Sequence, residues 1–196
     1  MPSSAEDITD AARLVVDCLN KPEMYSNSRI LLIGSYAISR YFSSVIPQAG
    51  RGWLEDKLVG NFSELFKDSR REGEGIRVRT TMVRLRFYPF ELLPWISSDD
   101  LQAIHDASGT GIIKVISAID MLVSRIFGLD TRMSRERRDQ DAVEASKLVL
   151  YLHRRNGGQG QIRLSGLQRD LIRPCLHLLV ESSVESEQWW RDRLGL

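Results

Sequence analysis

Apolar residues recur with two different periods along the chain, and the change of period separates a mixed first part from a mostly helical second part. Over residues 4–20 they recur every three or four positions, which predicts an amphipathic N-terminal helix. The continuous apolar run 30–33 is typical of a short buried strand, and Gly34 permits a tight exit into a helix that includes Tyr41 and Phe42. From residue 98 onward the helical period dominates.

The clearest strand signal covers residues 76–87. Apolar residues alternate there with four arginines, Arg77, Arg79, Arg84 and Arg86. This alternation predicts one long bent strand, or two strands joined by an irregular turn at Thr80-Thr81. The arginines then share one face, which is either a solvated surface or a basic floor that faces phosphate groups.

The remaining elements of the first part are shorter. Residues 53–59 fit either a strand or the start of a helix, and a helix is expected over 61–68. Residues 90–95 are expected to add an edge strand, residues 98–107 a short helix and residues 112–116 a strand. Together these elements predict an α+β fold with a small mixed β-sheet of four or five strands flanked by helices.

The second part reads as a series of capped helices. Ser117 is expected to cap a helix through residue 129, and residues 135–155 form a charged helix with Val143, Leu148 and Leu152 buried. Glycines at 157–160 break the chain, and the helix that follows from residue 165 must kink or restart at Pro174. We therefore expect an α/β core over 1–116 and a helical part over 117–196 that packs on it.

Composition and charge exclude several classes of function. The 196 residues include 27 basic and 26 acidic side chains, a formal net charge of +1. This excludes the strong positive field of a general nucleic-acid-binding protein, so anion binding must depend on a local arrangement. No apolar run approaches the roughly 20 residues that span a bilayer, and the polar N-terminus is unlike a signal peptide. We expect a cytoplasmic protein with no membrane partner, in which Cys18 and Cys175 are buried free thiols rather than a disulfide.

Two groups of residues suggest chemistry with phosphates. Gly34 and Ser35 stand where the buried strand is expected to turn into a helix, and backbone amides at such a turn can hold phosphate groups. Arg125 lies in an otherwise apolar helical stretch and therefore needs a partner. That partner is either a bound phosphate or, as a structural ion pair, Asp141 or Glu144.

The order of these motifs resembles the nucleotidyltransferase superfamily, especially its small antitoxin- and toxin-type members related to the bacterial abortive-infection transferases. The family's Gly-Ser opening, its Lys-x-x-Ala-x-x-x-Arg helix and its later pair of acids are matched by Gly34-Ser35, by Arg125, Gly128 and Arg132, and by Asp141 and Glu144. The resemblance implies a nucleoside triphosphate ligand and Mg²⁺ held by paired carboxylates. It also implies a set of nucleotide-binding residues: Gly34, Ser35, Arg125, Arg132 and Asp141.

The chain departs from this family at the metal pair. Residues 51–59 align with the family's Asp-x-Asp strand, but Glu55 takes the place of the first carboxylate and Lys57 that of the second. On a strand Glu55 and Lys57 point to one face and Asp56 to the other. A lysine cannot ligate Mg²⁺ and repels it, so Lys57 is expected to bind the nucleotide instead. If transfer is retained, Glu55 and Asp56 are the catalytic residues and Glu55 is a metal ligand.

Three functions remain open from the sequence. The leading hypothesis is a divergent nucleotidyltransferase-like protein, a pseudoenzyme that binds a nucleotide or another phosphorylated small molecule. The second is an active, metal-dependent nucleotidyltransferase that modifies RNA or a protein. The third is a non-enzymatic interaction module that uses the same fold to bind a protein partner, with Trp189-Trp190 either capping the core or marking the partner surface. The basic residues 132–138 offer weak support for a nucleic-acid contact.

Overall fold

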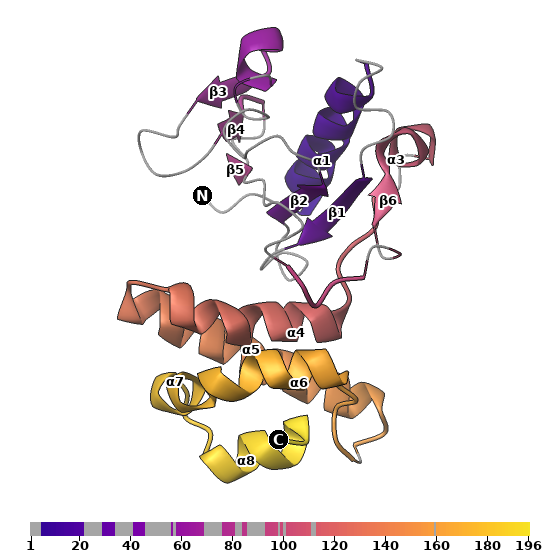
Figure 1. The fold of residues 1–196 in the computed structure, drawn as a ribbon. Coiled ribbons are helices and arrows are strands. Elements are labelled where there is room, and N and C mark those ends of the chain that lie inside the picture. The colour runs from indigo at the N-terminus through magenta and orange to yellow at the C-terminus, as the bar shows by residue number, and fades with distance from the viewer. Residues whose placement is uncertain are drawn as a thin grey trace. The chain divides into compact units, whose positions relative to one another are not determined.

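Contacts within the chain divide it into two compact units, Met1–Ile116 and Ser117–Leu196 (Figure 1). The coordinates come from a computed structural model. They describe residues 5–21, 29–33, 41–45, 56, 58–68, 76–80, 84–85, 93–97, 99, 101–110, 113–158 and 160–196.

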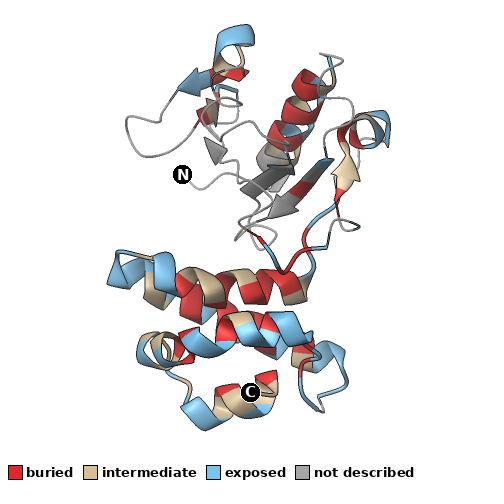
Figure 2. Ribbon diagram, in the orientation of Figure 1, coloured by how far each residue is buried: buried red, intermediate tan, exposed pale blue. Residues whose placement is uncertain are grey.

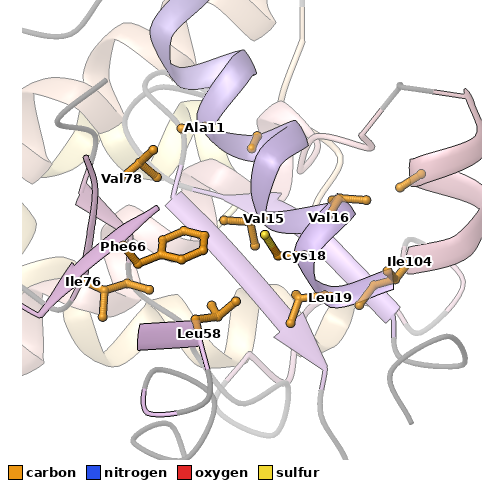
Figure 3. Packing of buried hydrophobic residues seen from close by; sticks show 12 residues of the cluster. Ala11, Val15, Val16, Cys18, Leu19, Leu58, Phe66, Ile76, Val78 and Ile104 are labelled. Carbon is orange, nitrogen blue, oxygen red and sulfur yellow. The ribbon is translucent and has the colours of Figure 1, made fainter. Parts of the chain in front are cut away.

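The core of the first unit is built around helix α1 (Ala5–Asn20), which the apolar period predicted. One face of this helix, which includes Val15 and Leu19, is buried among side chains from later segments of the unit. In Figure 3 the ring of Phe66 points toward Val15. The core cluster consists of Ala11, Ala12, Val15, Val16, Cys18, Leu19, Leu58, Phe66, Ile76, Val78, Ile104 and Ala107.

The predicted buried strand is present as β1 (Arg29–Ile33), but the segment that follows differs from the expectation. Residues Tyr41–Val45, placed in a helix by the sequence pattern, form β2, which pairs antiparallel with β1 so that Leu31 lies opposite Ser43. Strand β6 (Gln102–Ala103) pairs with the other edge of β1. The spacing of aromatic residues in 36–42 also fits a helix, and pairing with β1 decides for the strand because it satisfies the backbone groups of both segments.

A second sheet contains the arginine-rich segment. Strand β4 (Ile76–Val78) pairs antiparallel with β3 (Phe66–Asp68) on one side and with β5 (Arg84–Leu85) on the other. The segment therefore forms two strands rather than one. The helix expected over 61–68 is wrong: a helix that includes Leu58 ends at Asn61, and the chain then turns so that Phe66 pairs with Val78 and is fully buried.

The prediction of one mixed sheet with four or five strands is not confirmed in the described residues. The strands of the described residues form two separate three-stranded sheets, ordered β2-β1-β6 and β3-β4-β5, and all of their pairings are antiparallel. Alternation along a segment predicts that it is a strand, but it carries no information about which other strand will pair with it. The described part of the expected edge strand, residues 93–95, ends in a turn, and α3 begins only at Ile104 and continues to Thr110.

The segment 53–59 was open between a strand and a helix. Its described residues, Asp56, Leu58 and Val59, are helical, and the helix continues to Asn61. Glu55 and Lys57 themselves lie outside the described residues.

The second unit consists of helices, as the sequence predicted. Helix α4 (Ala118–Gly128) continues into the short 3₁₀ helix η5 (Leu129–Thr131), and α5 (Arg135–Arg155) has the expected bounds. Pro174 lies in a second 3₁₀ turn, η6, and breaks the next helix in two. The elements after α5 are α6 (Gly166–Ile172), η6 (Arg173–Cys175), α7 (Leu176–Ser182) and α8 (Glu187–Leu194).

Burial on α5 follows a single face (Figure 2). Leu148 and Leu152 are buried as predicted, whereas Val143 is 46% exposed and that part of the prediction is wrong. Ala142, Ala145 and Val149 define the inward face, and Val143 falls beside it. Of the helices described, none is long and apolar enough to cross a membrane.

Gly195 ends α8 in the left-handed conformation, with φ of 67°. A Cβ atom at this position would lie 2.9 Å from Oε1 of Gln161. We expect Gly195→Ala to lower the free energy of unfolding by about 1 kcal/mol, mainly because of the backbone conformation. Gly166→Ala is the matched control, since a Cβ there meets nothing within 4 Å, and urea unfolding of both variants measures the difference. Equal stability of the two variants would contradict the prediction.

Candidate functional site

Helix α4 carries an arginine into the interior of the second unit. Ser117 caps the helix by accepting a hydrogen bond from the backbone N–H of Asp120. The helix is apolar on nearly all sides, so Met121, Leu122, Val123 and Ile126 are buried, and Arg125 is buried with them at 6% exposure. A guanidinium group keeps its charge at any physiological pH, and its burial requires partners of opposite charge.

Those partners come from α5. Nη1 of Arg125 donates to Oδ1 of Asp141 at 2.8 Å, and Nε of Arg125 lies 2.9 Å from Oε2 of Glu144. The second oxygen of Asp141 accepts from Nε of Arg132 at 2.7 Å. Of the two partners left open for Arg125, a bound phosphate or a structural ion pair with Asp141 or Glu144, the structure shows the ion pair, and it includes both acids. We call Arg125, Arg132, Asp141 and Glu144 the Asp141 cluster.

The charges and the burial of the Asp141 cluster indicate a structural role for all of its residues except Arg132. Two guanidinium groups face two carboxylates, and Asp141 lies between both arginines with only 5% of its surface exposed. Arg125 is therefore already compensated by two carboxylates, and it has little remaining attraction for an anion. The side chain of Arg132 is 33% exposed, which makes it the arginine of the cluster that solvent ions can reach.

A second polar network, in which Asp120 and Gln168 are buried, joins two helix starts in the same unit. Ser165 and Gln168 form a reciprocal capping box at the start of α6. Gln168 also donates from Nε2 to Oδ1 of Asp120 at 2.8 Å, and the hydroxyl of Ser117 donates to Oδ2 of Asp120 at 2.6 Å. The sequence indicated the Ser117 cap and a helix start at Ser165, but the bond between Asp120 and Gln168 was missed because no local pattern links residues 48 positions apart.

Most of the other predicted site residues stay predictions, because the structure does not describe them. Gly34, Ser35, Glu55 and Lys57 lie outside the described residues, and Asp56 is an exposed residue of a helix. Of the predicted nucleotide-binding set, the structure brings together Arg125, Arg132 and Asp141. Within the described ranges, no three or more His, Cys, Asp and Glu side chains are grouped so that they could hold a metal ion.

Both cysteines are buried free thiols, one in each unit, as the sequence predicted. Burial raises the pKa of Cys18, and the carboxylates of Asp17 and Glu64 act in the same direction, while Lys21 opposes them. Burial also raises the pKa of the Cys175 thiol. Because the thiolate is the reactive form, neither cysteine has the environment of a nucleophile.

Comparison with known proteins gives a likeness of fold. No protein-family model matches the chain, and no curated protein matches its sequence significantly. A solved structure, that of an antigenic nucleotidyltransferase-like protein from Paracoccidioides brasiliensis, matches with a TM-score of 0.59 and 11% sequence identity. The match covers 99% of this chain and 96% of that one, so the two proteins share a fold over almost their whole length.

Proposed function

We propose that the chain is a divergent nucleotidyltransferase-like protein that binds a nucleotide or another phosphorylated small molecule and whose transfer chemistry is weak or lost. The likeness of fold to a nucleotidyltransferase-like protein along 99% of the chain carries the proposal. The motifs at Gly34-Ser35 and along α4 and α5 support it, because they occur in the order that the superfamily resemblance implies. Within the superfamily, we propose kinship with the small toxin- and antitoxin-type members.

The acidic residues are the reason why we propose that the transfer chemistry is weak or lost. The resemblance implies Mg²⁺, and the described carboxylates do not fit it: Asp56 is exposed on a helix, and the described residues offer no grouped metal ligands. Lys57 stands where the family has its second carboxylate, and its charge opposes a divalent cation. We therefore assign no catalytic step to a metal in this chain.

The binding of a phosphorylated ligand is expected to depend more on Gly34-Ser35 than on Arg125. Arg125 is held by Asp141 and Glu144, and a phosphate would have to compete with two carboxylates for it. Gly34 has no side chain, and this would allow the backbone amides of the predicted turn to approach the phosphate groups closely. We propose that Ser35, Lys57 and the partly exposed Arg132 add to this binding.

Thermal unfolding of the full chain with each nucleoside triphosphate, with and without Mg²⁺, tests the proposal. A ligand at about 100 times its Kd stabilises a protein by about 2.7 kcal/mol. For a chain of this size, that corresponds to a rise of roughly 5–10 °C in Tm. Gly34→Ala should reduce the rise, whereas Gly60→Ala is the matched control, because a Cβ at Gly60 meets nothing within 4 Å.

Two results would overturn the proposal in different ways. If no nucleotide or inorganic triphosphate raises Tm at millimolar concentration, the chain is not a phosphate-binding protein, and the interaction module takes its place. If the chain instead transfers label from a triphosphate to itself or to RNA, and Glu55→Gln abolishes that transfer, then the chemistry is retained. The second result would also establish Glu55 as a catalytic residue.

A further inference from the structure

Helix α5 packs into the second unit along one side, and its outward side carries a line of apolar surface. Val143, Leu150 and Tyr151 are 46%, 39% and 51% exposed. Residues seven or eight positions apart are separated by about two helical turns, so these side chains lie along one line of the helix. Exposed Lys147 stands one turn after Val143 on the same line, and its hydrocarbon stem adds to the apolar surface. We call the side of α5 that these four residues define the outer face.

The charges of the outer face are divided between its two ends. Its first turns carry the acids Glu136 and Asp139, and its later turns carry the bases Lys147 and Arg154. None of these four residues forms an ion pair with another described residue. The helix dipole favours acids on every side of the first turns, yet Arg137 occupies the side next to Glu136. The dipole therefore does not account for a division of charge that follows this one face.

We propose that the outer face binds the outer face of a second copy of the chain, with the two α5 helices antiparallel. Residues 136 and 154 are equally far from residue 145, the middle of α5. A two-fold axis at that point places Glu136 of each copy opposite the partner's Arg154. The same axis brings Val143 of each copy beside the partner's Leu150. A parallel pair would instead place like charges opposite one another, which works against that arrangement.

The size of the face indicates a weak and reversible dimer. Helix α5 has 21 residues, which corresponds to a length of about 30 Å. One pair of helices of this length falls at the low end of interface sizes, below about 1,200 Å², and we expect a Kd on the order of 10 μM. The apolar line supplies most of the affinity, and the charges fix the antiparallel orientation. This proposal does not depend on nucleotide binding.

Sedimentation equilibrium of the full chain, at concentrations from about 1 to 300 μM, tests the proposal. The mean mass should rise from that of the monomer toward that of the dimer. Leu150→Ser should raise the dimer Kd at least about tenfold, because it removes apolar surface from the centre of the interface. Leu167→Ser is the matched control, since it removes an exposed leucine of α6 in the same unit and should leave the Kd unchanged.

Charge reversal tests the orientation. Either Glu136→Arg or Arg154→Glu alone places like charges opposite each other twice in the dimer and should raise the Kd about tenfold. An equimolar mixture of the two single variants should associate as the wild type does, because each variant supplies the charge that the other lacks. The double variant should also recover the wild-type Kd. Arg169→Glu, which reverses an exposed charge of α6, is the matched control and should have no effect.

Any of three results would overturn the inference. The first is a wild-type chain that stays monomeric over the whole concentration range, which would leave the outer face to solvent or to a different protein. The second is a wild-type dimer whose Kd is unchanged by Leu150→Ser, since the dimer would then use another surface. The third is a mixture of the two charge variants that associates no better than either variant alone. Association of the mixture, in contrast, cannot result from misfolding of the single variants.

Discussion

Asp141→Asn is expected to lower the free energy of unfolding by about 3–5 kcal/mol, one of the two largest losses that we predict. The substitution keeps the shape of the side chain but removes its charge. Arg125 and Arg132 both lose a carboxylate, at 2.8 and 2.7 Å, and Arg125 stays buried with Glu144 alone to compensate it. Urea unfolding, followed by circular dichroism at the helix band, measures the loss.

The control for this prediction is Asp170→Asn, which removes an exposed carboxylate of α6 in the same unit. We expect it to change the stability by less than about 0.5 kcal/mol, as is usual for a surface substitution. A double-mutant cycle with Arg125→Met isolates the ion pair between Arg125 and Asp141. Arg125→Met should lower the free energy of unfolding much less in the Asp141→Asn variant than in the wild type. Similar losses for Asp141→Asn and Asp170→Asn would show that the cluster is not the structural centre that its geometry indicates.

The second unit could be predicted from the sequence because helices are specified locally. Ser117 and Ser165 mark helix starts through hydrogen bonds from the backbone N–H of residues three positions on. Pro174 interrupts the helix because an interior proline lacks the backbone N–H that the helix needs. The pairing of Arg125 followed from the same kind of reasoning. A charge in an apolar helix needs a partner, and the next helix offered Asp141 and Glu144 on one side.

The first unit was predicted less well because sheets are specified by distant partners. Nothing near Tyr41 shows that residues 41–45 will pair with β1, and nothing near Phe66 shows that it will lie opposite Val78. Both segments carry aromatic residues whose spacing also fits a helix, so the local pattern predicted helices where the structure has strands. The same difficulty applies to the polar network of the second unit. Asp120 and Gln168 are far apart in the sequence, and only the tertiary fold brings them together.

Trp190→Ala is expected to lower the free energy of unfolding by about 3–5 kcal/mol, because it removes a large side chain that is fully buried. The ring of Trp190 lies edge-on to that of Trp189 with centroids 4.8 Å apart, and its Nε1 donates to the hydroxyl of Ser183 at 3.1 Å. The hydrogen bond to Ser183 joins α8 to the segment after α7. The sequence left open whether Trp189-Trp190 caps the core or marks a partner surface, and the burial of Trp190 assigns that residue to the core.

Trp189→Ala is the matched control, since Trp189 is only partly buried and its ring is contacted by the guanidinium of Arg193 at 5.9 Å. We expect Trp189→Ala to lower the free energy of unfolding by well under half as much as Trp190→Ala, because Trp189 buries less apolar surface when the chain folds. Urea unfolding followed by circular dichroism compares the two variants without depending on the fluorescence that they change. If the two losses were equal, or if Trp190→Ala cost less than about 1 kcal/mol, α8 would not be anchored through Trp190, and the tryptophan pair would have to be considered as a surface for a partner.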